Sequence, residues 1–313
     1  MDKAKINEIQ NAIQNAIGEN GEVKLVTMQK IGGAEEGFNI RFQGDNVGVV
    51  LYPKDCQAML DSGVSPKEIG EYLAAEAEKH RYDYADVMAI NKDRFRDGVY
   101  IQMVNADVNE ELLKNAVHDS IDDMAAVVRC RVSGNVEDGI GSFLVTTDNL
   151  GYFQMTQGEV LEQAYKNTAK QNFEIEGLNA MMRTGLHEQG VPEDVLREMI
   201  PDNDELAYVL TNQEKMNGAN ALVCPETLRD VYDKLEEPYY VLPSSTHELM
   251  IIPESRGMDV DEMKNMLHDV NVSEVAPKDL LSFKVFRYDG MKLSAAEELK
   301  KISEKKDKIK LMM

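Results

Sequence analysis

The densest group of potentially reactive side chains in the sequence is a polar run that directly follows Pro243. It reads Ser244-Ser245-Thr246-His247-Glu248 and lies between two short apolar segments. A hydroxyl, an imidazole and a carboxylate are the groups that acyl-transfer enzymes use as nucleophile, base and acid. Ser245, His247 and Glu248 are therefore candidate catalytic residues of a hydrolase-like or transferase-like enzyme.

A structural explanation of the same run competes with the catalytic one. Neighbouring residues rarely face one another, and working triads are assembled from distant segments of a chain. No GxSxG motif surrounds either serine. A hairpin turn in which hydroxyls and the imidazole bond to backbone groups accounts for the same composition. We prefer this turn interpretation and keep the catalytic one as the alternative.

Cys224 is a second candidate nucleophile, because it directly precedes Pro225 at a predicted junction between a strand and a helix. The positive end of a helix dipole lowers the pKa of a thiol, and His247 could serve as its base if the two predicted hairpins pair. The alternative, which we prefer, is a small apolar residue that ends a buried strand.

Other polar residues suggest binding rather than catalysis. Asn212 and Asn271 each follow a predicted strand or helix, and Ser244 begins the polar run. We treat these three as candidate binding residues, although asparagine at such positions also forms caps and turns. The sequence contains no P-loop, no GxGxxG after a strand and no HExxH, so we expect neither a metal nor a cofactor.

The charge of the chain limits its partners. Its 313 residues carry a formal net charge of −22, which repels a phosphate backbone, so direct binding of nucleic acid is not expected. A non-enzymatic, acidic module that binds another protein, a basic one, is our leading hypothesis. A small-ligand sensor that uses a groove between two sheets is a further alternative. The sequence predicts no particular oligomeric state.

The cysteine content and the apolar runs indicate a compartment. Three widely spaced cysteines without a CxxC motif, at positions 56, 130 and 224, argue against a disulfide framework. No apolar run resembles a signal peptide or approaches the length of a membrane span. We therefore expect a cytoplasmic protein with no membrane association.

Periodicity and turn residues predict an α+β fold with largely antiparallel sheets, a meander and hairpins, packed against helices. Predicted strands cover 23–29, 38–43, 47–51, 99–104, 124–132, 140–146, 206–210, 219–223, 239–242, 249–252 and 284–287. Predicted helices cover 3–17 and 171–190, and others begin at Pro66, Gln157, Pro192, Pro225, Val260 and Ser294. Two of these starts carry capping boxes, at Ser65-Glu68 and Thr156-Glu159, and we expect the pairs Asp259-Glu262 and Ser294-Glu297 to cap two further helices.

We divide the chain into three parts. Residues 1–100 hold the N-terminal helix, the meander and further helices. Residues 101–290 form an α+β domain with strand–strand–helix units, and residues 291–313 form a charged, Lys-rich terminal helix or tail.

Several segments of the sequence resemble one known family. The most specific is the PSSxHE pattern in its strand context, and it is accompanied by Tyr208-Val209-Leu210-Thr211-Asn212, Gly218-Ala219, Asn109-Glu110-Glu111-Leu112-Leu113 and Leu280-Leu281-Ser282. Together they are similar to the signature of an uncharacterised bacterial family, domain of unknown function 5688, over roughly residues 20–290. The resemblance implies a cytoplasmic bacterial protein of this architecture and implies no activity.

Overall fold

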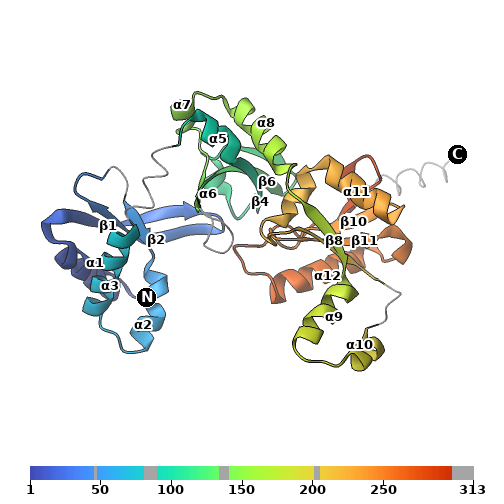
Figure 1. Ribbon diagram of the computed structural model, residues 1–313, viewed down its shortest axis with the longest axis horizontal. Helices are drawn as coiled ribbons and strands as arrows, with labels where there is room; N and C mark the ends of the chain where they lie inside the picture. Colours follow the sequence, from blue (N-terminus) through green and yellow to red (C-terminus); the bar gives the residue numbers. More distant parts are fainter. Residues whose placement is uncertain (46–47, 81–89, 134–140, 201–204, 298–313) are drawn as a thin grey trace, which may run out of the picture. The chain divides into compact units, whose positions relative to one another are not determined.

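The structure is a computed structural model, and it describes residues 1–45, 48–80, 90–133, 141–200 and 205–297 (Figure 1). The chain divides into two compact units, Met1–Asn91 and Lys92–Met313. The predicted α+β class is confirmed, because the described residues form helices and three sheets in which every strand pair is antiparallel.

The first unit is a three-stranded meander packed against helices. Its sheet has the order β1-β2-β3, and its elements are α1 (Lys3–Ile17), β1 (Gly21–Lys30), β2 (Gly33–Phe42), β3 (Val49–Leu51), α2 (Gln57–Asp61) and α3 (Pro66–Lys79). The core is formed by the apolar stripe of α1, namely Ile6, Ile9, Ile13 and Ile17, with Phe38 and Ile40 of β2. Gly70 permits the close approach of the two long helices, since a Cβ there would lie 2.4 Å from that of Ala12.

The second unit contains two sheets. The first has the order β4-β6-β5, with β7 paired to β6, and its strands are β4 (Val99–Asn105), β5 (His118–Ile121), β6 (Met124–Ser133) and β7 (Gly141–Leu144). Its helices are α5 (Lys92–Gly98), α6 (Glu110–Leu113), α7 (Leu150–Phe153) and α8 (Gln157–Thr168). We call this four-stranded sheet the small sheet.

The second sheet of this unit, here called the large sheet, has the order β13-β12-β10-β11-β9-β8. Its strands are β8 (Phe173–Gly177), β9 (Tyr208–Asn212), β10 (Tyr239–Leu242), β11 (Leu249–Pro253), β12 (Phe286–Tyr288) and β13 (Leu293–Ala295). The accompanying helices are α9 (Leu178–Glu188), α10 (Glu193–Met199), α11 (Pro225–Leu235) and α12 (Val260–Ser273), together with the 3-10 segment η4 (Gly218–Val223).

Side chains, rather than another strand, satisfy the outer edge of β4. Thr168 Oγ1 accepts a hydrogen bond of 2.8 Å from the backbone N–H of Ile101. The fully buried Asn220 donates from Nδ2 to the carbonyl of Ile101 at 2.6 Å and accepts at Oδ1 from the N–H of Met103 at 3.1 Å. These bonds occupy backbone groups that would otherwise be open to further strand pairing.

The predicted helix caps at Ser65, Thr156 and Asp259 are confirmed, whereas three other local predictions are wrong. The predicted capping boxes form at Ser65 and Thr156, and the predicted cap at Asp259 is a capping box as well. The predicted strand 219–223 is instead the 3-10 segment η4, because Asn217 takes a left-handed conformation and Asn220 contacts β4 through its side chain.

The other two wrong predictions concern segments that are predicted as helices but contain strands. Residues 171–190 contain β8 before α9, and the alternating exposure of Phe173 through Glu176 is the period of a strand. Ser294 does not cap a helix, since it lies in β13 opposite Arg287. Residues 298–313 of the predicted terminal helix lie outside the described residues, and no sequence signal predicts β5.

Candidate functional site

The polar run after Pro243 connects β10 to β11 and is held by backbone hydrogen bonds. Ser244, Ser245 and Thr246 are each at most 6% exposed. The carbonyl of Ser244 accepts from the N–H of Leu281 at 3.1 Å, and the N–H of Thr246 donates to the carbonyl of Asp279 at 2.8 Å. The run is therefore a turn whose backbone is fixed by the segment that follows α12.

His247 is positioned by several segments. Its Nδ1 accepts a hydrogen bond of 3.3 Å from the N–H of Asn217, so the proton of the neutral ring is on Nε2, which lies 3.4 Å from a carboxylate oxygen of Asp279. Its carbonyl accepts from the Thr211 hydroxyl at 2.8 Å and from the N–H of Gly218 at 2.9 Å. Both ring nitrogens thus have partners within the protein.

Neither of the two other candidate catalytic residues of the run forms a hydrogen bond or an ion pair with the imidazole. The hydroxyl oxygen of Ser245 accepts from the backbone N–H of His247 at 3.0 Å. Glu248 is half-buried, and among the described residues it makes no hydrogen bond or ion pair. The turn therefore brings His247 together with Asp279 and backbone groups rather than with a nucleophile.

Cys224 is 2% exposed and lies between η4 and α11. Its thiol donates to the carbonyl of Asn220 at a distance of 3.4 Å. Burial raises the pKa of this thiol to about 12, because a thiolate would lose its hydration. Desolvation thus outweighs the lowering expected at a helix N-terminus, and the thiol is protonated at neutral pH.

The two candidate asparagines bond to nearby backbone. Asn212 donates from Nδ2 to the carbonyl of Met216 at 2.8 Å and accepts at Oδ1 from the N–H of the same residue at 3.1 Å. Asn271 donates from Nδ2 to the carbonyl of Ser282 at 2.8 Å, while its Oδ1 is buried without a partner. Only Asn212 belongs to the pocket described below.

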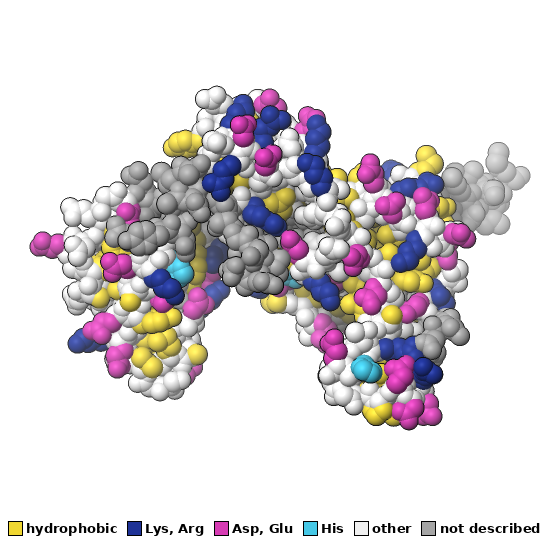
Figure 2. All heavy atoms as spheres, viewed as in Figure 1, with side chains coloured by type: hydrophobic (Ala, Val, Ile, Leu, Met, Phe, Trp, Pro, Cys, Tyr) yellow, Lys and Arg dark blue, Asp and Glu magenta, His cyan; other side chains and the backbone are white. Residues whose placement is uncertain are grey.

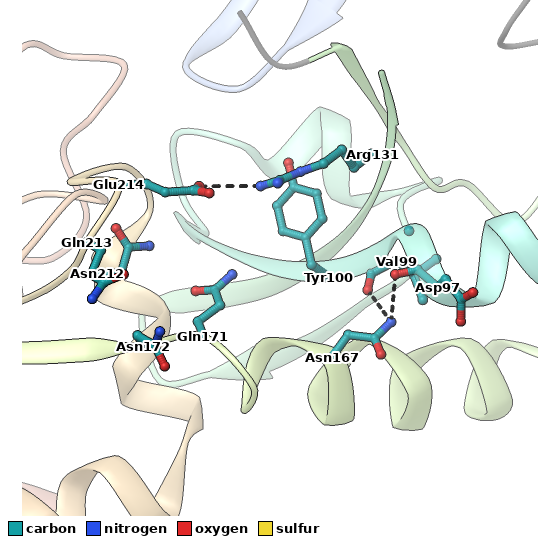
Figure 3. Close-up of a pocket in the computed structure, with 11 residues that line it drawn as sticks. Asp97, Val99, Tyr100, Arg131, Asn167, Gln171, Asn172, Asn212, Gln213 and Glu214 are labelled. Carbon is teal, nitrogen blue, oxygen red and sulfur yellow. Dashed lines mark hydrogen bonds and ion pairs between the residues drawn. The ribbon is translucent and has the colours of Figure 1, made fainter. Parts of the chain in front are cut away.

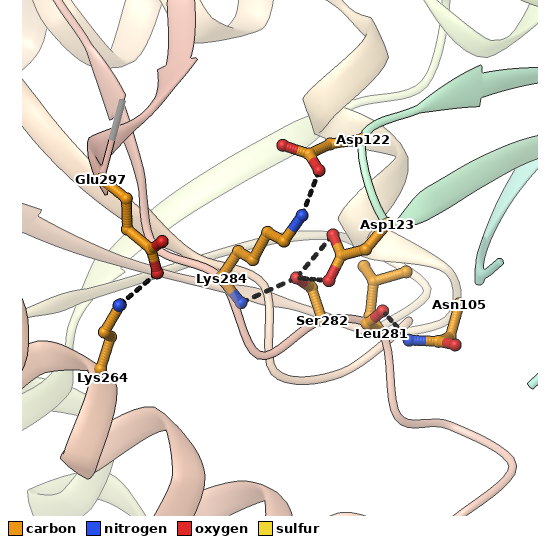
Figure 4. A network of polar contacts seen from close by, with 8 residues as sticks. All are labelled: Asn105, Asp122, Asp123, Lys264, Leu281, Ser282, Lys284 and Glu297. Atoms are coloured by element: carbon orange, nitrogen blue, oxygen red, sulfur yellow. Dashed lines mark hydrogen bonds and ion pairs between the residues drawn. The ribbon is translucent and has the colours of Figure 1, made fainter. Parts of the chain in front are cut away.

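A polar network joins the small sheet to the loop before β12 (Figure 4). The fully buried Ser282 donates its hydroxyl to the Asp123 carboxylate at 2.8 Å and accepts from the N–H of Lys284 at 2.9 Å. Lys284 also pairs with Asp122, and Asn105 donates to the carbonyl of Leu281. Burial raises the pKa of Asp123, which identifies this network as desolvated. These hydrogen bonds and the ion pair connect the small sheet to the segment that leads into the large sheet.

A polar pocket of about 320 Å³ lies where both sheets of the second unit contribute residues (Figure 3). The small sheet and its helices supply Asp97, Gly98, Val99, Tyr100, Arg131 and Asn167, and the segments that flank β8 and β9 supply Gln171, Asn172, Asn212, Gln213 and Glu214. Carboxamides dominate this lining. We refer to it as the carboxamide pocket.

The hydrogen-bonding capacity of the carboxamide pocket is only partly used. Asn167 donates to the carbonyls of Arg96 and Val99, and Gln213 donates to Glu174. By contrast, Gln171 Oε1 is buried with no hydrogen-bond partner. Figure 3 shows this carboxamide in the middle of the pocket, between Tyr100 on one side and Asn212 and Gln213 on the other. A buried oxygen of this kind is a ready acceptor for a ligand.

One wall of the carboxamide pocket is charged and aromatic. The Arg131 guanidinium lies 5.9 Å from the centre of the Tyr100 ring and 3.4 Å from a carboxylate oxygen of Glu214. Sequence reasoning missed this site apart from Asn212, because its residues come from separate segments. The cluster Asn167-Thr168-Ala169-Lys170-Gln171-Asn172 and the pair Asn212-Gln213 were its only local signals.

Two kinds of feature are absent from the part of the chain that the structure describes. No group of three or more His, Cys, Asp or Glu side chains is arranged so that it could hold a metal ion. No helix in the described ranges combines the length and the apolar character needed to cross a membrane.

Comparison with known proteins identifies the family. The model of a family of unknown function, DUF5688, matches residues 5–290. The chain belongs to this family. The DUF5688 match includes the turn after Pro243 and every residue of the carboxamide pocket. Comparisons with curated proteins and with solved structures give no match.

Proposed function

We propose that this protein is a non-enzymatic binding protein that holds a small polar molecule in the carboxamide pocket. The observation that carries the proposal is the buried and unpaired Oε1 of Gln171 in the lining of a pocket. An unpaired buried acceptor costs the folded protein about 1–3 kcal/mol, and a ligand that donates to it recovers this energy. The volume of about 320 Å³ lies within the range of ligand pockets.

The geometry gives the hydrolase or transferase hypothesis less support. The hydroxyl of Ser245 accepts from the backbone N–H of His247 and forms no hydrogen bond with the imidazole, and burial raises the pKa of Cys224 to about 12. An activated nucleophile needs a base within hydrogen-bond reach. His247 has such contacts only with backbone and with Asp279 among the described residues.

The proposal is tested by ligand screening with a variant that fills the pocket. Small amines, amides, sugars and carboxylates are screened by ligand-observed NMR against the wild type and Asn172→Trp, since Asn172 is an exposed lining residue. Asn265→Trp, on the exposed face of α12, is the matched control. We expect at least one class to bind the wild type and the control but not Asn172→Trp. Binding of no class, or equal binding to Asn172→Trp, would overturn the proposal.

A second candidate function is an acidic module that binds a basic protein. It is supported by the net charge of −22 and by Glu226 and Asp230, which are exposed on successive turns of α11. Figure 2 shows acidic and basic side chains interspersed over the visible face, so the acidic character there is not concentrated in one patch. Exposed charges of this kind act through long-range attraction that salt screens.

Basic nucleic-acid-binding proteins are the appropriate probes for this second function. Association should appear at low salt, weaken at high salt, and fall further when Glu226 and Asp230 are both replaced by Lys. Absence of any salt-sensitive association would count against it.

A further inference from the structure

The charge balance of the carboxamide pocket favours one class of ligand. Its lining contains two carboxylates, Asp97 and Glu214, against a single guanidinium, Arg131. That guanidinium is already paired with Glu214 at 3.4 Å. Within the described lining, the carboxylate of Asp97 has no hydrogen bond or ion pair of its own. An anionic ligand would therefore meet an excess of negative charge and no free cation.

The end of a helix adds to this negative potential. Asn167 lies in the last turn of the 12-residue helix α8, and it lines the pocket. The C-terminus of a helix is equivalent to about half a negative charge, which attracts cations. The buried Gln171 Oε1 acts in the same direction, because it is an acceptor that lacks a donor.

The tyrosine ring in the lining of the pocket already interacts with one cationic side chain of the protein. Arg131 Cζ lies 5.9 Å from the centre of the Tyr100 ring, within the distance at which a ring attracts a positive charge. Carboxylates, a carboxamide oxygen, a helix C-terminus and a tyrosine ring thus occur together around one pocket. Each of them interacts favourably with an N–H donor that carries positive charge.

We propose that the ligand of the carboxamide pocket carries a positively charged amino or guanidinium group. This inference rests on the proposed function, and it names the class of molecule that the pocket takes. The group could belong to a free small amine or to a lysine or arginine side chain of a basic protein. The same recognition chemistry serves both sources, so the experiment separates them.

The test compares probes of matched shape and different charge. Butylguanidinium, butylammonium, the neutral isostere butylurea and the anion butyrate are titrated into the full-length protein at low salt by NMR chemical-shift mapping. A blocked Gly-Arg-Gly peptide represents the side-chain source. We expect the cations to bind at least about tenfold more tightly than butylurea, since one charge-assisted hydrogen bond has that effect. Butyrate should not bind.

Variants assign the effect to the pocket. Asp97→Asn should remove most of the difference between butylguanidinium and butylurea, whereas Glu198→Gln, an exposed acid on α10, should leave it unchanged. Tighter binding of butylguanidinium than of the peptide indicates a free amine, and the reverse order indicates a protein side chain.

Equal affinity for butylurea and butylguanidinium, or an unchanged difference in Asp97→Asn, would overturn the charge assignment and leave the pocket function standing. Failure of cations, butylurea and every other screened class alike would overturn the proposed function itself.

Discussion

The turn after Pro243 and the carboxamide pocket are both rich in polar residues, yet they differ in how those residues are used. In the turn, Ser245, Thr246 and His247 all bond to atoms of the protein. In the pocket, the buried oxygen of Gln171 bonds to nothing. The turn is concentrated in five consecutive residues, whereas the pocket draws its lining from several segments.

This difference separates two reasons for a polar residue to be buried. A buried polar group that has hydrogen-bond partners positions the chain and supports a unique fold. Removing its partner would leave a buried group without a hydrogen bond, which costs free energy of folding. An unsatisfied buried group lowers stability, and where it also lines a pocket, as Gln171 does and Asn271 does not, a ligand is the explanation that we propose. Density of polar residues in a sequence is therefore a weaker indicator of function than unmet hydrogen-bonding capacity in a structure.

The largest expected effect concerns Cys224, whose buried thiol already has a hydrogen-bond partner within the protein. With a pKa of about 12, roughly one thiol in 10⁴ is ionised at pH 8. We expect iodoacetamide to modify Cys224 in the native protein more than about 1,000-fold more slowly than in the urea-unfolded chain. Peptide mass spectrometry at timed intervals measures both rates. Rapid modification of Cys224 by iodoacetamide in the native protein at pH 8 would support Cys224 as a nucleophile.

Asn220 is the clearest satisfied carboxamide and the counterpart of Gln171. Asn220→Ala removes the partners of Ile101 and Met103 on the buried edge of β4, so we expect a loss of about 2–4 kcal/mol in the free energy of unfolding. Asn265→Ala on the exposed face of α12 should change it by less than about 0.5 kcal/mol. Urea denaturation measures both. If Asn220→Ala lowers the free energy of unfolding by less than about 1 kcal/mol, the distinction between buried carboxamides with and without partners is weakened.

Within the turn, two neighbouring serines provide a matched pair. Ser245→Ala removes the acceptor of the N–H of His247, and we expect it to lower the free energy of unfolding by about 1 kcal/mol. Ser244→Ala removes a hydroxyl that has no partner among the described residues, so its effect should be smaller. Neither change should alter ligand binding in the pocket. Loss of binding in Ser245→Ala would contradict the structural role of the turn.

The smallest effect is expected at the ion pair between Glu254, which follows β11, and Arg287 of β12. Arg287 donates to both oxygens of Glu254, at 2.8 and 2.9 Å, and thereby lowers the pKa of that carboxyl below its ordinary value. The stabilisation is therefore present above the unfolded-state pKa and is lost as the pH falls through the lower folded-state pKa.

Glu254→Gln should accordingly cost at most about 1 kcal/mol at pH 7, because the pair is partly exposed, and less towards pH 3. Urea denaturation at pH 7, 5 and 3 follows this trend. A cost that does not change with pH would show that the ion pair contributes only through packing.

Local sequence signals predicted much of the fold. The stripe of isoleucines in α1 and the helix caps at Ser65, Thr156 and Asp259 depend on neighbouring residues only, and all of them form as expected. Residues 219–223 were predicted incorrectly because their geometry depends on Asn220 reaching β4, more than 100 residues earlier in the chain. A short-range pattern cannot record such a contact.

The candidate site shows the same limit more strongly. Asn212 was recognised as a polar residue at a strand end, and it does line the pocket. Gln171, Tyr100 and Arg131 carry no motif and are far apart in the sequence. Tyr100 and Arg131 become neighbours when β4 pairs with β6, and the lining is complete only when residues beside β8 and β9 join them. That Gln171 lacks a hydrogen-bond partner is a property of the folded protein and has no counterpart in the sequence.

The most direct test of the central claim is the stability of Gln171→Leu in the absence of any ligand. If the unpaired Oε1 is kept for a ligand, its removal should raise the free energy of unfolding by about 1 kcal/mol and abolish binding of whichever probe binds the wild type. Gln14→Leu is the control, because the Gln14 carboxamide donates to Gly18 and Gly21 and accepts from Val23, so this change should be destabilising. Urea denaturation, with each variant compared in the transition of its own unit, provides the measurement. A loss of stability in Gln171→Leu similar to that in Gln14→Leu would contradict the account.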